Sequence, residues 1–225
     1  MNHTSIRALF RANSVFLLPY ALFLLVAGSV LCLYPRADIH LYINAHSRVW
    51  GDDFFRIVTN LGDGLFVFLV ALCFLAYRVE NGLLLGISGI LAGLFTQVLK
   101  RTVFSSWERP KKFFEGVHDL YLVPGVTNYS GHTFPSGHAA SAFALYFAIA
   151  VLTPNKALKL FLFLVAGTVA FSRVYLSQHF LNDVYAGSLL GIFSVILAWW
   201  ILRSKPFEGK AWLNKSLLMK NKSAA

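Results

Sequence analysis

The chain has 225 residues, of which 57% are hydrophobic, 16% are aromatic and only 13% are charged. This balance is more apolar than that of ordinary soluble domains and indicates an integral membrane protein. The net charge of +10 requires no nucleic-acid partner, because much of it falls in short loops and a Lys-rich tail that can face anionic lipid head groups.

Apolar runs close to the ~20 residues that cross a bilayer recur along the chain, without the period-two alternation of a β-barrel. The first run is too long for a cleavable signal and has no small-x-small cleavage pattern before it ends, so we expect an anchored helix. The sequence predicts an all-α integral membrane bundle in a single domain, 1–225, with its core over 14–202 and a basic cytoplasmic tail over 203–225. Six transmembrane helices are expected at about 14–33, 62–78, 82–99, 138–153, 158–176 and 183–202.

The connections predict how these helices are arranged. Residues 34–61 mix charged and aromatic side chains, which favours a short amphipathic helix at the membrane interface. The very short link at 78–82 makes the second and third helices antiparallel neighbours. One set of loops carries a large excess of Lys and Arg, so we expect it to be cytoplasmic together with both termini. The long connection 100–137 then lies on the outer side.

Two clusters of functional side chains belong to that outer connection. Lys100 and Arg101 end the third helix, where cations are also ordinary partners of the helix dipole. Arg109 is different, because Pro110 stiffens the backbone beside it. Further on, Ser136 is a natural N-cap, and the open amides from Gly137 onward form an anion site. His138 lies directly beside that site.

A third cluster lies where the last two apolar runs meet, in the stretch 171–183. Asp183 follows His179 by four residues, so its carboxylate can hold one ring nitrogen and aim the other outward, as an oriented nucleophile or base requires. Arg173 supplies a permanently charged fork suited to phosphate oxygens. A capped helix start with a surface ion pair is the alternative interpretation of this cluster taken alone.

The combination of the three clusters decides between these interpretations, because all of them fall at helix ends on the same side of the membrane. Together they offer cationic contacts, neutral donors and two histidines, which describes a phosphoryl-transfer site. No clustered carboxylates suited to Mg²⁺ and no Cys/His set with zinc spacing accompany them, so we expect no metal and no other cofactor.

At these residues the sequence resembles the type 2 phosphatidic acid phosphatase superfamily. Pro135-Ser136-Gly137-His138 matches the second part of the family signature, and Ser172-Arg173 with His179 and Asp183 matches the third. The first part, Lys followed after six residues by Arg-Pro, departs slightly, since eight residues separate Lys100 from Arg109 and seven separate Arg101 from it. Either Lys100 or Arg101 can therefore be the phosphate contact, and we favour Lys100.

The resemblance implies a mechanism. His179 attacks phosphorus to give a phosphohistidine while Asp183 fixes its tautomer. His138 protonates the leaving alkoxide and then activates water. Phosphate oxygens are held by Lys100, Arg109, Arg173, Ser136 and the Gly137 amide. His132 could touch the leaving group, although an ordinary loop histidine is the simpler interpretation.

The resemblance also implies a lipid phosphatase that hydrolyses a phosphomonoester or pyrophosphate head group, located in a bacterial inner membrane with its active site facing the periplasm. Phosphatidate, phosphatidylglycerol phosphate, a polyprenyl pyrophosphate and lipid A all fit as substrates. A lipid phosphotransferase using the same site and a lipid transporter or flippase are the alternatives, whereas the similar vanadate-dependent haloperoxidases are soluble. The sequence leaves the oligomeric state open.

Overall fold

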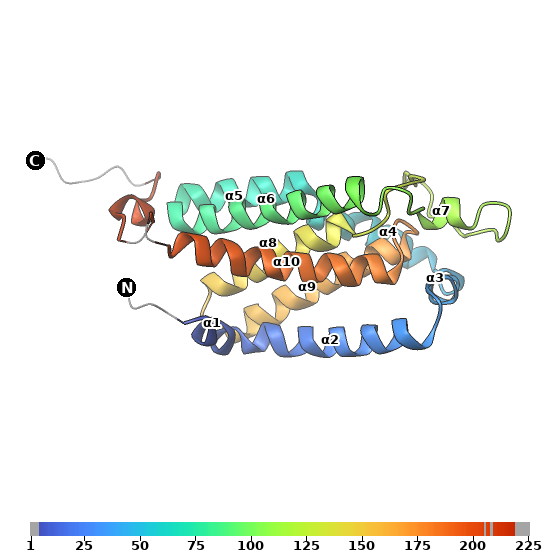
Figure 1. The fold of residues 1–225 in the computed structure, drawn as a ribbon, viewed down its shortest axis with the longest axis horizontal. Coiled ribbons are helices and arrows are strands. Elements are labelled where there is room, and N and C mark those ends of the chain that lie inside the picture. The colour runs from blue at the N-terminus through green and yellow to red at the C-terminus, as the bar shows by residue number, and fades with distance from the viewer. Residues whose placement is uncertain (1–4, 205, 208, 219–225) are drawn as a thin grey trace, which may run out of the picture.

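The computed structural model describes residues 5–204, 206–207 and 209–218, and every regular element among them is helical (Figure 1). The predicted basic tail is therefore described only in part, since residues 205, 208 and 219–225 lie outside these ranges. In chain order the elements are α1 (Ile6–Ala12), α2 (Ser14–Leu33), α3 (Arg36–Ala45), α4 (Val49–Val58), η1 (Thr59–Gly62), α5 (Gly64–Tyr77), α6 (Val79–Thr102), α7 (Pro110–Phe113), α8 (Gly137–Leu152), α9 (Lys156–Tyr175), α10 (Leu181–Leu202) and η2 (Ala211–Asn214). The six predicted apolar helices correspond to α2, α5, α6, α8, α9 and α10, with every boundary within three residues of its expected position.

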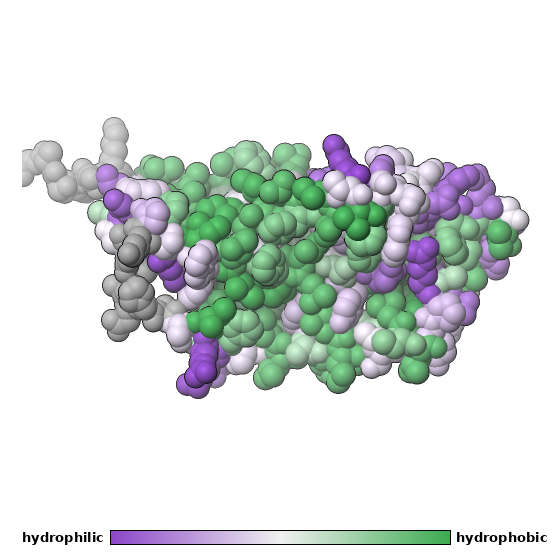
Figure 2. Space-filling model, viewed as in Figure 1, coloured by the Kyte–Doolittle hydropathy of each residue, from purple (hydrophilic) through white to green (hydrophobic). Residues whose placement is uncertain are grey.

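The number of complete membrane spans is supported only in part. Within the described ranges, four helices are long and apolar enough to cross a bilayer: α2, α6, α9 and α10. A fifth span results if Val49–Gly62 and Gly64–Tyr77 are taken as one span with a 52° bend. The remaining apolar helix, α8, has 16 residues, so it rises roughly 24 Å and is shorter than the ~30 Å hydrocarbon core. An outer face that is apolar along the middle of the bundle and polar toward its ends agrees with a membrane location (Figure 2).

Helix α8 forms the centre of the bundle, and its side chains are almost all buried. It packs against α6, α9 and α10. The contact with α10 is especially close: a Cβ added to Gly187 would lie 2.4 Å from the carbonyl oxygen of Ser136, and one added to Gly191 would lie 2.5 Å from that of Ala140. Small residues at a helix interface let backbones approach where lipid provides no hydrophobic driving force. This contact sets the distance between the N-termini of α8 and α10.

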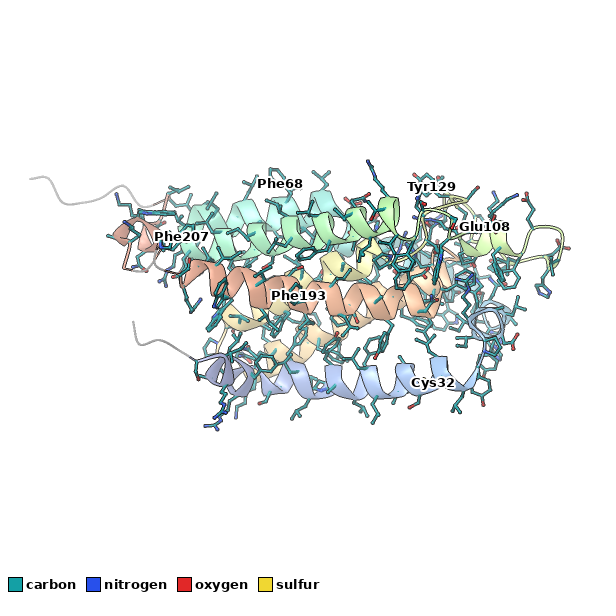
Figure 3. All side chains as sticks on the ribbon, in the orientation of Figure 1. Cys32, Phe68, Glu108, Tyr129, Phe193 and Phe207 are labelled. Atoms are coloured by element: carbon teal, nitrogen blue, oxygen red, sulfur yellow. The ribbon has the colours of Figure 1, made fainter. Side chains whose placement is uncertain are left out.

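The ends of the bundle differ in what they carry. Helices α1 and η2 lie at one end, whereas α3, α4 and α7 lie at the other (Figure 1). Figure 3 shows Phe207 at the first end and Tyr129 and Glu108 at the second. The predicted amphipathic segment 34–61 forms two short helices, α3 and α4, and several of their large apolar side chains are exposed, among them Tyr42, Trp50 and Ile57. Such side chains suit the membrane–water interface.

Candidate active site

The turn between α9 and α10 carries His179 to the end of the bundle where α3 and α7 lie. After α9 ends, Ser177 adopts a left-handed conformation with φ 53°, which costs a non-glycine residue about 1 kcal/mol or more. Two side chains of α3 hold the Ser177 hydroxyl at 3.2 Å each, namely Nε2 of His40 and Nδ2 of Asn44. The backbone amides of Gln178 and His179 then both donate to the Arg173 carbonyl. Helix α3 therefore supports the turn that presents the histidine.

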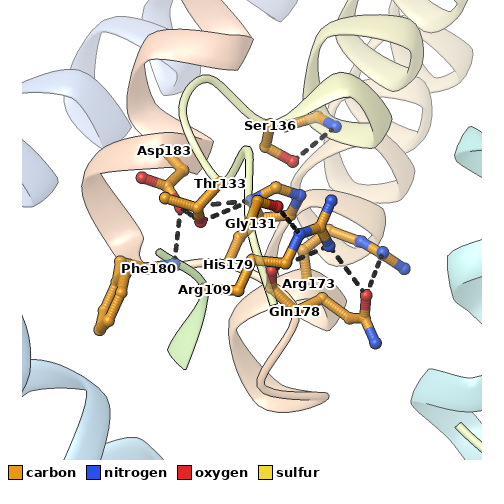
Figure 4. Close-up of polar contacts among 10 residues, drawn as sticks. Arg109, Gly131, Thr133, Ser136, Arg173, Gln178, His179, Phe180 and Asp183 are labelled. Atoms are coloured by element: carbon orange, nitrogen blue, oxygen red, sulfur yellow. Dashed lines mark hydrogen bonds and ion pairs between the residues drawn. The ribbon is translucent and has the colours of Figure 1, made fainter. Parts of the chain in front are cut away.

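His179 is oriented by the carboxylate predicted for this purpose. Its Nδ1 lies 3.2 Å from Oδ2 of Asp183, and the two side chains are 2% and 0% exposed. Oδ2 also accepts from the Phe180 amide at 3.0 Å and from the hydroxyl of Thr133 (Figure 4). Thr133 Oγ1 is 3.3 Å from the same Nδ1. With the proton on Nδ1 facing the carboxylate, the lone pair of Nε2 is left available for chemistry.

The surroundings keep His179 in its neutral form. Burial lowers the pKa of His179 well below its usual range. Three nearby cations, Arg109, Lys100 and Arg173, lower this pKa further, as does His138. A neutral imidazole is the form that can act as a nucleophile at neutral pH. The effect of these charges on His179 indicates that Arg109, Lys100, Arg173 and His138 lie around it.

A glutamine joins the two arginines of the site. Oε1 of Gln178 accepts from Nη1 of Arg109 at 3.1 Å and from Nη2 of Arg173 at 3.2 Å (Figure 4). Nε2 of Gln178 donates to the Thr127 carbonyl at 2.7 Å, which fixes the direction of the amide. Arg173 also donates to the Thr59 hydroxyl at 2.6 Å, while its buried Nε has no partner among the described residues. The two guanidinium groups are therefore aligned by a neutral acceptor and keep donors for an anion.

The start of α8 has the predicted cap. Ser136 is fully buried and its Oγ accepts from the Ala139 amide at 3.4 Å. The Ser136 amide donates to the Asp183 carbonyl at 2.9 Å, which ties the second and third motifs together through the backbone. Nε2 of His138 lies 3.8 Å from Oδ2 of Asp63, whose other carboxylate oxygen caps α5 by accepting from the Leu65 amide. His138 thus borders the site opposite a carboxylate.

The first motif is completed by α6 and the loop after it. Lys100 lies in the last turn of α6 and is only 7% exposed, whereas its neighbour Arg101 is exposed. Nε of Arg109 donates to the Gly131 carbonyl at 3.0 Å, and burial lowers the pKa of Arg109 without removing its charge. His132 has φ 55° and its Nδ1 lies 3.3 Å from the Lys100 carbonyl, beside this cluster. The difference in burial supports Lys100 as the phosphate contact.

Four further side chains in the site were not predicted from the sequence: Gln178, Thr133, Asp63 and Thr59. None belongs to a recognisable spacing pattern, and Thr59 and Asp63 come from the η1–α5 junction, distant in sequence. The one available signal was the position of Gln178 directly before His179 and of Thr133 directly after His132.

The fold and the site together define an integral membrane helical bundle in which a buried, oriented histidine faces a cluster of cations. The chain belongs to the PAP2 superfamily, whose sequence pattern matches residues 81–206, more than half of the chain. This match confirms the resemblance stated from the three motifs.

Two relatives and two solved structures are similar to parts of the chain. It is 32% identical over 93 residues to a lipid A 4'-phosphatase of Bacteroides thetaiotaomicron, covering 41% of each protein, and 32% identical over 106 residues to a lipid A 1-phosphatase of Rhizobium etli, covering 45% of this chain and 42% of the relative. The chain thus matches less than half the length of these relatives.

Among solved structures, Aquifex aeolicus LpxE superposes with a TM-score of 0.64 and 26% identity over 72% of this chain and 93% of that one. A PAP2-type phosphatidylglycerolphosphate phosphatase from Bacillus subtilis superposes with a TM-score of 0.59 over 85% of this chain and 96% of that one, at 24% identity, which shows the common fold.

Proposed function

We propose that the protein is an integral membrane lipid phosphatase that hydrolyses a phosphomonoester or pyrophosphate head group through a phosphohistidine. The observation that carries this proposal is the 3.2 Å contact between Nδ1 of His179 and the Asp183 carboxylate, which leaves Nε2 available beside Lys100, Arg109 and Arg173. Membership of the PAP2 superfamily and similarity to lipid A phosphatases support the same reaction class.

In the first step, the Nε2 lone pair of His179 forms a bond to phosphorus as the bond to the leaving oxygen breaks. His138, which gains a proton when the bound phosphate offsets the surrounding cations, gives that proton to this oxygen, so the lipid leaves as an alcohol or a shorter phosphate. Asp183 stabilises the positive ring through Nδ1. The three cations, the Ser136 hydroxyl and the Gly137 amide hold the equatorial oxygens, where charge develops.

In the second step, neutral His138 takes a proton from water as the water oxygen attacks phosphorus. The bond between phosphorus and Nε2 breaks, inorganic phosphate leaves, and both histidines return to their starting states. No group of three or more His, Cys, Asp and Glu side chains in the described part of the chain could hold a metal ion.

The substrate class follows from where the site lies. It is at a bundle end, where a lipid can keep its chains in the bilayer while its head enters the cationic cluster. Lipid A is one candidate because two relatives act on it; phosphatidate, phosphatidylglycerol phosphate and undecaprenyl pyrophosphate are the others. We propose that the site lies on the periplasmic face of a bacterial inner membrane. Helices α1 and η2 lie at the opposite end of the bundle (Figure 1), and the excess of Lys and Arg in the loops predicted for that side favours the cytoplasm.

The test is phosphate release by the detergent-purified protein and its His179→Ala variant on these four lipids, with EDTA present. Release by the wild type alone supports the nucleophile and metal independence. Equal release by His179→Ala contradicts the mechanism, and loss of wild-type release on adding EDTA contradicts metal independence. If the folded wild type releases no phosphate from any of these lipids, the proposed activity is rejected.

A further inference from the structure

A cavity of about 820 Å³ adjoins the cationic cluster at the end of α6. Two of its lining residues, Lys100 and Arg109, belong to the candidate phosphate site, so the cavity and that site are continuous. Its wall also includes Gln97, Arg101, Ser130 and His132. Figure 3 shows Tyr129, another residue of this wall, at the same end of the bundle. A space of this size can hold a large part of a lipid head group.

The charge on this wall exceeds what one phosphate requires. A phosphomonoester carries a charge of about −1.5 to −2 at neutral pH, and Lys100, Arg109 and Arg173 already offset it. Arg101 adds a further cation, and none of the described residues that line the cavity is Asp or Glu. Arg101 also forms no ion pair or side-chain hydrogen bond with any residue of the described chain.

The position of Arg101 can be explained in part without a ligand, because a cation in the last turn of α6 interacts favourably with the helix dipole. Lys100, in the same turn, already provides that interaction. The dipole gives no reason for Arg101 to face a cavity that contains the phosphate site and lacks carboxylates. A guanidinium is instead well suited to bind phosphate oxygens with two parallel hydrogen bonds.

We infer that Arg101 binds a second phosphoryl group on the head of the substrate, next to the one that is hydrolysed. This inference rests on the proposed phosphatase function and narrows the class of its substrates. The cavity then favours lipid heads with two phosphoryl groups, whether these are joined as a pyrophosphate, linked through glycerol or separated on a sugar. Phosphatidate, with a single phosphate, makes no use of Arg101.

The kinetic test compares kcat/KM for phosphatidate with kcat/KM for phosphatidylglycerol phosphate, undecaprenyl pyrophosphate and lipid A in matched micelles. Arg101→Gln should lower kcat/KM for at least one doubly phosphorylated lipid by about ten-fold or more and leave phosphatidate within about two-fold, the size expected for one charged hydrogen-bonded contact. The lipid whose kcat/KM falls shows how the two phosphoryl groups are arranged in the preferred substrate. Arg101→Lys should recover part of the loss.

Lys111→Gln is the matched control, because it removes one exposed cation from α7, outside the cavity wall. If it lowers kcat/KM for the doubly phosphorylated lipid, relative to phosphatidate, as much as Arg101→Gln does, the effect is general electrostatic attraction and the inference is wrong. The inference is also overturned if Arg101→Gln leaves kcat/KM unchanged for every doubly phosphorylated lipid, or if it lowers kcat/KM for phosphatidate equally.

A binding measurement tests the inference without requiring catalytic turnover. Inorganic pyrophosphate should raise the thermal midpoint of the detergent-solubilised wild type more than inorganic phosphate does at equal concentration. Arg101→Gln should remove this difference while phosphate stabilisation remains. A wild type that releases no phosphate from any lipid rejects the proposed function. If the two anions stabilise it equally, directly joined phosphoryl groups are rejected whatever the activity, and the kinetic comparison decides on the wider spacings.

Discussion

Replacing Gln178 by Leu tests whether the two arginines are aligned by its side-chain oxygen. The change removes the acceptor of Arg173 Nη2 and one of the two acceptors of Arg109 Nη1, which retains the Gln178 carbonyl at 3.2 Å. A hydrogen bond to a charged group contributes about 1.5–3 kcal/mol. Counting one full bond at the buried Arg173, we expect transition-state stabilisation to fall by about 2 kcal/mol, or kcat/KM by about 30-fold.

The assay is phosphate release in detergent micelles together with inhibition by vanadate, which reports anion binding directly. Gln178→Leu should weaken both. It should also lower the thermal midpoint, because the Thr127 carbonyl loses the Nε2 donor of Gln178, so both are measured well below that midpoint. Gln178→Glu retains an acceptor but places a negative charge between the guanidinium groups, so vanadate should bind it weakly too. Asn81→Leu, at the other end of α6, is the matched amide control. If folded Gln178→Leu keeps wild-type vanadate inhibition and kcat/KM within about three-fold, the alignment argument is refuted.

Three further predictions address the support of the site. Thr133→Val removes the hydroxyl that donates to Asp183 and should lower kcat about ten-fold with KM nearly unchanged; unchanged steady-state kinetics would contradict this. Gly187→Ala should cost about 1–3 kcal/mol through its clash with the Ser136 carbonyl, whereas Gly167→Ala, with open space around it, should not; equal thermal midpoints would show that α8 and α10 can separate freely. Burial lowers the pKa of His40 to about 4. The unfolded chain therefore binds the extra proton below pH 6.5, and up to about 3 kcal/mol of stability should be lost as the pH falls from 6.5 toward 4. His40→Phe should show a shallower dependence of the thermal midpoint on pH, and a dependence as steep as that of the wild type would contradict the assignment.

The sequence predicted the helices well because each is a long apolar run between polar segments. Ser136, predicted as a cap, accepts from an amide in the first turn of its helix, and the structure adds Asn155 and Asp63, which do the same for theirs. The number of full spans was less predictable, since α8 is apolar but short and central, and composition alone does not distinguish a buried helix from a lipid-facing one. The kink between η1 and α5 likewise depends on packing.

Within the site, residues that act through their own chemistry were predictable, and residues that position them were not. His179 and Asp183 are one helical turn apart, so sequence spacing is enough to pair them. Gln178 and Thr133 function through partners 69 and 50 residues away in sequence. A glutamine and a threonine have many ordinary uses, and only the folded chain shows that their oxygens meet an arginine pair and the Asp183 carboxylate.

The geometry of the site depends on helix packing as much as on its hydrogen bonds. Ser136 begins α8 and Asp183 lies in the first turn of α10, and their backbones are joined by a 2.9 Å hydrogen bond. That bond can form only because Gly187 lets the two helices approach. The first amides of α8, proposed to bind phosphate, and the carboxylate that orients His179 are thereby held together. A loss of activity caused by separating α8 from α10 should therefore reduce phosphate binding and nucleophile orientation together, whereas the Gln178 and Thr133 variants should affect them separately.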